Sequence, residues 1–161
     1  MEQKSLIPDN FEILSSDIHL FTDASKIGFG AILGNAWLQS QWDQRTSKWS
    51  IDTQEMFAII VAASTWGYKW AGKRIVFVTD NLPITQIWDI GTTKSVELMG
   101  LVRKLFLIAA RQDFSISLKH IPGFLNPIAD AISRFQDLRF RQLMPTADLM
   151  STKIPALVWE I

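Results

Sequence analysis

Three short segments near the start of the chain have the alternation of β-strands. In Asp17–Ser25, the side chains of Ile18, Leu20 and Thr22 point to one side, and those of His19, Phe21 and Asp23 point to the other. Gly28–Gly34 and Ala36–Trp42 follow after short connections. Because such short connections join antiparallel neighbours, the three segments are expected to form an antiparallel meander.

Further along the chain, helical and strand patterns alternate. In Thr53–Trp70, apolar residues recur at helical spacing, and the continuous apolar strand Arg74–Asp80 follows. A strand that is reached through a helix normally runs parallel to an earlier strand of the sheet. The elements expected after it are the helices Pro83–Ile90 and Ser95–Arg111, the strand Phe114–Pro122 and the helix Asn126–Phe135. The pattern predicts an α/β fold with a five-stranded mixed sheet.

The remaining segments and the composition define the domain. We expect a linker over residues 1–16, one domain over residues 17–135 and a C-terminal extension or connector over residues 136–161. The chain lacks cysteine, which excludes disulfides and thiolate metal sites. It contains no signal-peptide pattern and no apolar run of membrane-spanning length, so no membrane partner is expected. Its net charge of zero excludes a strong overall basic field for nucleic acid.

Four acidic residues lie at the ends of successive elements. Asp23 lies in the first strand, Asp80 ends the fourth, Glu55 lies near the start of the long helix, and Asp130 lies in the last helix. Each has an ordinary alternative: Asp23 or Asp80 in a turn, Glu55 in a capping box with Asp52, and Asp130 at the positive end of its helix. Together they suit one cleft for hard divalent cations, which prefer oxygen ligands. Two such ions can activate a water and stabilise the leaving oxygen of a phosphodiester.

Four sequence blocks in a fixed order extend this interpretation. They are TDAS-x-x-G-x-GA at 22–31, SI-x-x-x-E at 50–55, VTDN at 78–81 and HIPG-x-x-N-x-x-AD-x-x-SR at 120–134. This set resembles the ribonuclease H domain of retroelement reverse transcriptases, most closely that of gypsy-type and DIRS-like retrotransposons. The resemblance implies a ribonuclease H-like fold, with helices on both faces of the sheet. It also implies an endonuclease that cuts the RNA strand of an RNA/DNA hybrid with two Mg²⁺ ions, for which Mn²⁺ substitutes.

The resemblance also implies roles for individual residues. The four catalytic and metal-binding acids carry over to Asp23, Glu55, Asp80 and Asp130. His120 precedes Asp130 by ten positions, the spacing of a histidine that helps with proton transfer or product release in many ribonucleases H, although it also suits a strand end. Candidate substrate contacts are Ser25, Asn81 and Asn126, and Asn126 also suits the cap of the last helix. An adjacent polymerase domain and a location in the cytoplasm or in a retroelement particle are implied as well.

Some features depart from the family or leave alternatives open. The basic handle of many cellular ribonucleases H is missing, because residues 81–119 hold five basic and three acidic residues without a cluster. Trp37 and Trp49, near loops, are candidates for surface contacts. The arginine- and phenylalanine-containing segment Arg134–Leu143 either touches a hybrid or is a solvated helix end. A catalytically inactive module remains an alternative function, although no acid is missing. An integrase or transposase would need its closing glutamate in a late helix, whereas here Asp130 stands there.

Overall fold

The structure, a computed structural model, describes residues 17–161. Its strands and helices follow one another in the expected order, and one further helix lies within residues 136–161, where an extension or connector was expected. They are β1 (Ile18–Ala24), β2 (Gly28–Leu33), β3 (Ala36–Gln41), α1 (Ile51–Trp66), β4 (Arg74–Thr79), α2 (Leu82–Ile90), α3 (Val96–Gln112), β5 (Ser115–His120), α4 (Pro127–Ser133) and α5 (Asp137–Leu143). No helix within residues 17–161 is long and apolar enough to cross a membrane.

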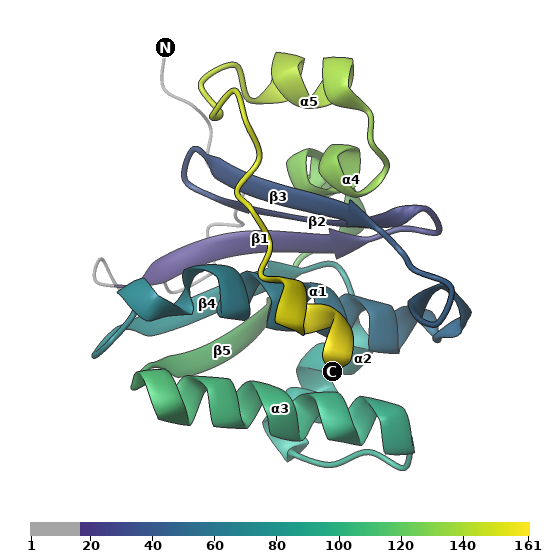
Figure 1. The fold of residues 1–161 in the computed structure, drawn as a ribbon, viewed down its shortest axis with the longest axis vertical. Helices are drawn as coiled ribbons and strands as arrows, with labels where there is room; N and C mark the ends of the chain where they lie inside the picture. The colour runs from purple at the N-terminus through teal and green to yellow at the C-terminus, as the bar shows by residue number, and fades with distance from the viewer. Residues whose placement is uncertain (1–16) are drawn as a thin grey trace.

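The five strands form one mixed sheet in the order β3-β2-β1-β4-β5 (Figure 1). The strands β1, β2 and β3 pair antiparallel, as their short connections predict. The strand β4 follows α1 and pairs parallel with β1, and β5 pairs parallel with β4. The mixed α/β sheet predicted from the sequence is therefore confirmed, and β1 stands at its centre.

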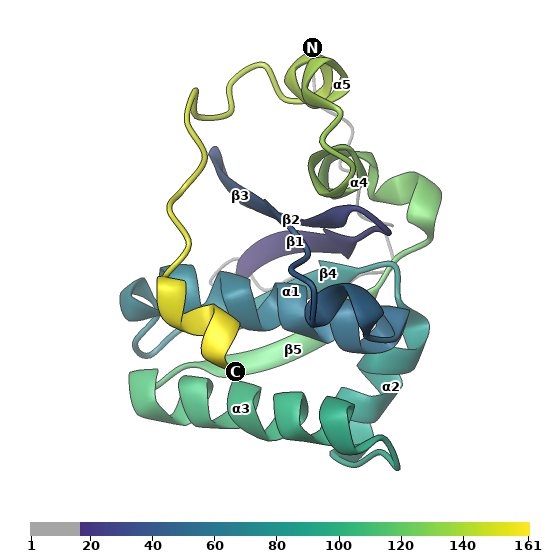
Figure 2. The same cartoon turned by 45° about the vertical axis from the view of Figure 1, so that its right-hand side comes forward.

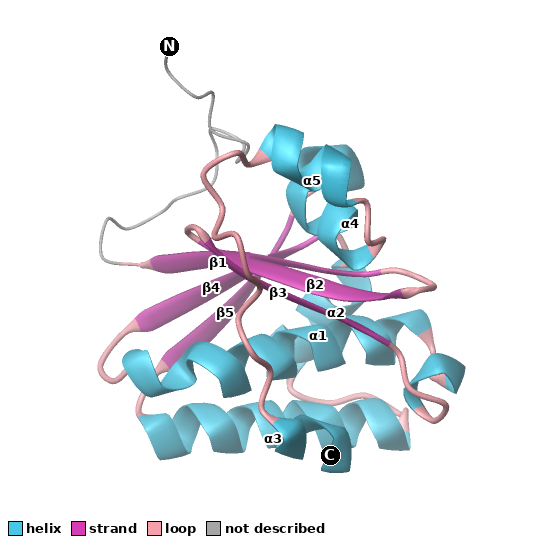
Figure 3. Cartoon of the chain, turned by 45° about the horizontal axis from the view of Figure 1, so that its top comes forward, coloured by secondary structure: helices cyan, strands magenta, loops and turns pink. Residues whose placement is uncertain are grey.

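Helices cover both faces of this sheet, as predicted (Figure 3). On one face α1 packs against β1 and β2, and α3 packs against α1. On the other face α4 packs against β1 and β2, and α5 packs against α4. A Cβ atom at Gly30, in β2, would overlap the side chain of Ile132 in α4. Glycine at this position thus allows α4 to lie close to the sheet, beside the partner residue Asp23.

The long helix α1 differs from the predicted helix Thr53–Trp70 in both of its ends and in its burial, and it ends at Trp66, where a 3₁₀ turn follows. It begins at Ile51 because Ser50 is its N-cap, and the Ser50 hydroxyl accepts a hydrogen bond from the Thr53 amide. The proposed capping box between Asp52 and Glu55 is therefore wrong, since both residues lie inside the helix. The helix is also buried almost all round, because the sheet covers one side and α3 and the C-terminal segment cover the other.

The C-terminal segment, residues 136–161, packs against the rest of the domain. After α5 it passes the edge strand β3, where the Thr152 amide donates to the Trp37 carbonyl (Figures 1 and 2). It ends in a 3₁₀ turn on α1, where Val158 is buried and the Trp159 ring lies 5.5 Å from the Phe57 ring. In α5, Phe140 is buried against Trp37. Trp37 is therefore a core residue, and the prediction of a surface contact for it is wrong.

Candidate metal centre

Two aspartates lie side by side at one edge of the sheet. The parallel register of β1 and β4 pairs Phe21 with Val78, and Asp23 and Asp80 each stand two residues further along. Because side chains alternate between the faces of a sheet, both carboxyl groups stand at the same level and on the same face. The two acids predicted to meet through the parallel pairing of their strands do meet.

Glu55 completes this cluster from the second turn of α1. One carboxylate oxygen from each of Asp23, Glu55 and Asp80 lies within 4.8 Å of the other two. Asp23 and Glu55 are each only 3% exposed, and Asp80 is half-buried. A buried carboxylate is costly unless it has a partner, yet the Glu55 Oε2 atom has no hydrogen-bond partner. The donor set and the orphaned oxygen fit a hard divalent cation.

The electrostatics of the cluster follow from this crowding. Burial, and after it the charge of Asp80, raises the pKa of Asp23 to about 7, although a hydrogen bond from Ser133 works in the opposite direction. Burial, and then the charges of Asp23 and Asp80, raises the pKa of Glu55 well above its usual range. The pKa of Asp80 is raised by burial and by the charge of Asp130. The three groups resist ionising together, which a bound cation would relieve.

Asp130 does not join this group of oxygens. It lies in the first turn of α4, and its carboxylate accepts hydrogen bonds from Arg134 Nε at 2.8 Å and from Arg139 Nη1 at 2.6 Å. Partial burial pushes the pKa of Asp130 upwards, but the two arginines outweigh this effect and lower it. Its charge still acts on Asp23 and Asp80. The structure thus brings three of the four predicted acids together and holds the fourth beside them in ion pairs.

His120 and Asn81 lie at the same edge of the sheet. His120 ends β5, where it is exposed and is paired in register with Thr79, and its charge offsets a small part of the rise in the pKa of Asp80. Asn81 caps α2, because its Oδ1 accepts from the Ile84 amide at 3.0 Å. Its Nδ2 donates to Asp52 Oδ1 at 2.9 Å, which ties α2 to the first turn of α1. Their roles in proton transfer and in substrate contact stay predictions.

Ser25 and Asn126, predicted as substrate contacts, are both buried and bonded within the protein. The Ser25 hydroxyl donates to the Ser133 carbonyl at 2.8 Å, which joins the β1–β2 turn to α4. The Asn126 Nδ2 donates to the Thr22 carbonyl at 3.1 Å, next to Asp23. Asn126 stands at the N-cap position of α4, as expected, but its side chain bonds to Thr22 and makes no capping bond to the helix.

Residues beyond the predicted set also shape the site. The buried Ser133 hydroxyl donates to Asp23 Oδ2 at 2.8 Å. Arg134 stands four residues after Asp130, a spacing from which a helical ion pair could have been predicted. Arg139 comes from the next helix, and nothing in the local sequence indicates that it reaches Asp130.

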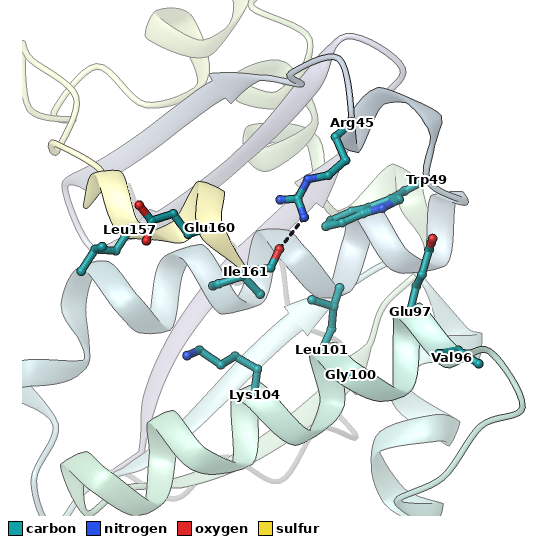
Figure 4. A pocket seen from close by; sticks show the side chains of 10 residues that line it. All are labelled: Arg45, Trp49, Val96, Glu97, Gly100, Leu101, Lys104, Leu157, Glu160 and Ile161. Atoms are coloured by element: carbon teal, nitrogen blue, oxygen red, sulfur yellow. Dashed lines mark hydrogen bonds between the residues drawn. The ribbon is translucent and has the colours of Figure 1, made fainter.

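A separate pocket of about 720 Å³ lies on the α1 and α3 side of the molecule (Figure 4). Arg45 crosses its upper side and donates to the carbonyl oxygen of Ile161 at 2.7 Å. Trp49, Leu101 and Leu157 contribute apolar walls. None of the four predicted acids lines this pocket, so it is distinct from the candidate metal centre.

Comparison with known proteins places this geometry in a known family. Residues 14–107 match the family described as "RNase H-like domain found in reverse transcriptase". The chain is 30% identical over 136 residues to the transposon Tf2-3 and Tf2-4 polyproteins of Schizosaccharomyces pombe. These alignments cover 76% of the chain but only 10% of each polyprotein.

Solved structures share the fold at lower sequence identity. Ribonuclease H1 from Halobacterium salinarum superposes with a TM-score of 0.59 and 17% identity, covering 75% of this chain and 98% of that protein. The LC11 ribonuclease H1, solved in complex with an RNA/DNA hybrid, gives a TM-score of 0.60 and 18% identity, covering 71% and 92% of the two chains. These similarities confirm the predicted fold.

Proposed function

The chain belongs to the family of RNase H-like domains found in reverse transcriptase, and from this premise we propose that it is a metal-dependent endonuclease. It hydrolyses the RNA strand of RNA/DNA hybrids as the ribonuclease H domain of a retrotransposon reverse transcriptase. The observation that carries the proposal is the buried cluster of Asp23, Glu55 and Asp80. A stable fold gains nothing from three carboxylates at this spacing, so the cluster is best explained by a cation that it binds.

The cation in the proposal is Mg²⁺, bound as two ions and replaceable by Mn²⁺. Carboxylates without cysteine or histidine are suitable ligands for these hard ions. Asp23, Glu55 and Asp80 would hold the ions through their clustered carboxylate oxygens. Asp130 would join them from α4 once its carboxylate turns away from Arg134 and Arg139. When bound, the ions supply Lewis acidity, which activates a water and stabilises the leaving oxygen of a phosphodiester.

The protein's own residues position this chemistry. Ser133 holds the Asp23 carboxylate by the hydrogen bond to Oδ2. Asn81 links α1, which carries Glu55, to α2, which follows Asp80. His120 stands on the rim next to Asp80, from which it assists proton transfer or product release. The bond from Ser133 orients Asp23 before substrate arrives, and the bonds of Asn81 hold the two elements that carry Glu55 and Asp80 together.

The substrate and partner follow from the same premise. The LC11 enzyme was solved with an RNA/DNA hybrid, and the transposon relatives are polyproteins, which supports a hybrid as the substrate and a polymerase domain as the neighbour. Selectivity for a hybrid would rest on contacts to 2′-hydroxyl groups and on backbone shape. A catalytically inactive binding module is the second candidate, but the presence of all four acids favours the enzyme.

The test is cleavage of an end-labelled RNA/DNA hybrid with Mg²⁺ or with chelator. We expect cuts in the RNA strand only, and none in duplex DNA or single-stranded RNA. Asp80→Asn should abolish cutting, whereas Asp89→Asn, at an exposed position in α2, should not change it. Wild-type protein that binds the hybrid but never cuts it would favour the inactive module instead.

A further inference from the structure

The carboxylate of Asp130 is shared between two helices. Arg134, at the end of α4, donates through Nε to Oδ1, and Arg139, in α5, donates through Nη1 to Oδ2. Both oxygens of Asp130 are therefore engaged by cations. Before this carboxylate can turn towards Asp23 and Asp80, at least one of these two charge-assisted hydrogen bonds has to break.

The two arginines differ in how they are held. Arg134 bonds to Asp130 across one helical turn. Arg139 reaches Asp130 from α5, with a second bond to Gln136 Oε1 at 2.8 Å. The next residue, Phe140, is buried against Trp37, so packing fixes α5 and with it the stem of Arg139. The side chain of Arg139 is 43% exposed, and its bonds to Asp130 and Gln136 both use Nη1.

We propose that Arg139 is a positioning residue that exchanges one anion for another during the reaction. Without substrate it holds Asp130 away from the cluster. When Asp130 turns inwards to the metal centre, the guanidinium loses its carboxylate partner and binds a backbone phosphate of the hybrid. This inference rests on the proposed function. It adds a contact between α5, the helix that follows Asp130 in the sequence, and the backbone of the hybrid.

The physical basis is competition for one carboxylate. Metal ions and the two guanidinium groups are alternative cationic partners of Asp130, so removing one arginine should favour the metal. A released guanidinium presents a planar set of donors that matches a phosphate. Arg139 is thus expected to oppose metal binding in the free protein and to support binding of the hybrid.

The experiment compares wild type with Arg139→Gln and with Arg111→Gln, an exposed arginine of α3 on the opposite face of the sheet. Mn²⁺ affinity is measured without nucleic acid by titration calorimetry. Hybrid affinity is measured by fluorescence anisotropy in Ca²⁺ at several salt concentrations, and gels confirm that the hybrid stays intact. Arg139→Lys, which keeps the charge but loses the planar fork, is the conservative variant.

For Arg139→Gln we expect Mn²⁺ to bind about two- to five-fold more tightly, the size of an exposed ion pair. Hybrid should bind several-fold more weakly, with a salt slope reduced by about one phosphate contact. Arg111→Gln should change neither property, and Arg139→Lys should keep most of the salt slope. A merely structural arginine would lower both affinities together, so the opposite signs identify the exchange.

Two results overturn the proposal. If wild type binds Mn²⁺ and cuts hybrid but Arg139→Gln shows unchanged or weaker Mn²⁺ binding, or an unchanged salt slope, the exchange is refuted while the proposed function stands. If wild type neither binds Mn²⁺ nor cuts hybrid, the proposed function fails, and the exchange fails with it.

Discussion

Replacing Asp23 with asparagine should make the metal-free protein more stable. Asp23 is buried beside Glu55 and Asp80, and the amide removes a charge that the folded protein accommodates poorly. The asparagine side chain keeps the shape and can still accept the hydrogen bond from Ser133. The stabilisation should come at the cost of metal binding, because the central ligand is lost.

The size of the effect follows from the pKa of Asp23. A carboxyl group whose pKa is raised on folding binds a proton more readily in the folded state, so its contribution to stability is full below the unfolded pKa and is lost as the pH rises to the folded one. The rise from 3.8 to about 7 corresponds to about 4 kcal/mol at pH 8, since one pKa unit is worth about 1.4 kcal/mol. The figure of about 4 kcal/mol is the free energy of unfolding that the folded protein loses when Asp23 ionises. At pH 5 this loss is only about 2 kcal/mol, and it becomes small near pH 4.

Thermal melts in chelator at pH 8 and pH 5 measure this difference. For a chain of this length, 1 kcal/mol moves Tm by about 2–4 °C, so Asp23→Asn should raise Tm by at most about 8–16 °C at pH 8 and by about half of that at pH 5. Wild type should gain roughly 1.4 kcal/mol from 10 mM Mg²⁺ if its Kd is about 1 mM, and the variant should lose most of this gain. Asp89→Asn is the control. A variant that melts below wild type at pH 8, or that gains as much from Mg²⁺, would refute the metal site.

Two further predictions concern the rim of the site and the charge of the domain. His120→Ala should still cut the hybrid, but with a changed pH–rate profile and at a rate lowered by no more than the roughly 10²–10⁴-fold that general acid–base catalysis typically provides. An unchanged rate and profile would leave His120 as a strand-end residue. Because the net charge is zero, the isolated chain should bind hybrid weakly, with an affinity that falls as salt rises. Nanomolar binding that is insensitive to salt would contradict this expectation.

Most strands and helices of the fold could be predicted because the spacing of apolar residues within each segment determines which element it forms. The alternation in Asp17–Ser25 and the apolar run Arg74–Asp80 each correspond to a strand. The helix between them predicts the parallel pairing, and that pairing brings Asp23 and Asp80 together. The family predicted from the four sequence blocks is confirmed, and the transposon relatives are consistent with its gypsy-type origin.

What the sequence did not predict depends on contacts between distant segments. The burial of Trp37 and of both sides of α1 requires the C-terminal segment to fold back over them. The ion pair between Arg139 and Asp130 spans nine residues and two helices. The bond from Asn126 to Thr22 joins residues 104 positions apart. No periodicity within a single element contains this information.

If Asp23, Glu55 and Asp80 form a metal centre, a crystal of the protein soaked in Mn²⁺ should hold ions at these three carboxylates. An anomalous difference map, recorded where manganese scatters anomalously, locates the ions without relying on activity. Peaks are expected in contact with the oxygens of these three carboxylates, and none is expected in the same position for Asp23→Asn. Anomalous peaks found only elsewhere on the protein, with the three side chains unchanged and unliganded, would contradict the metal centre.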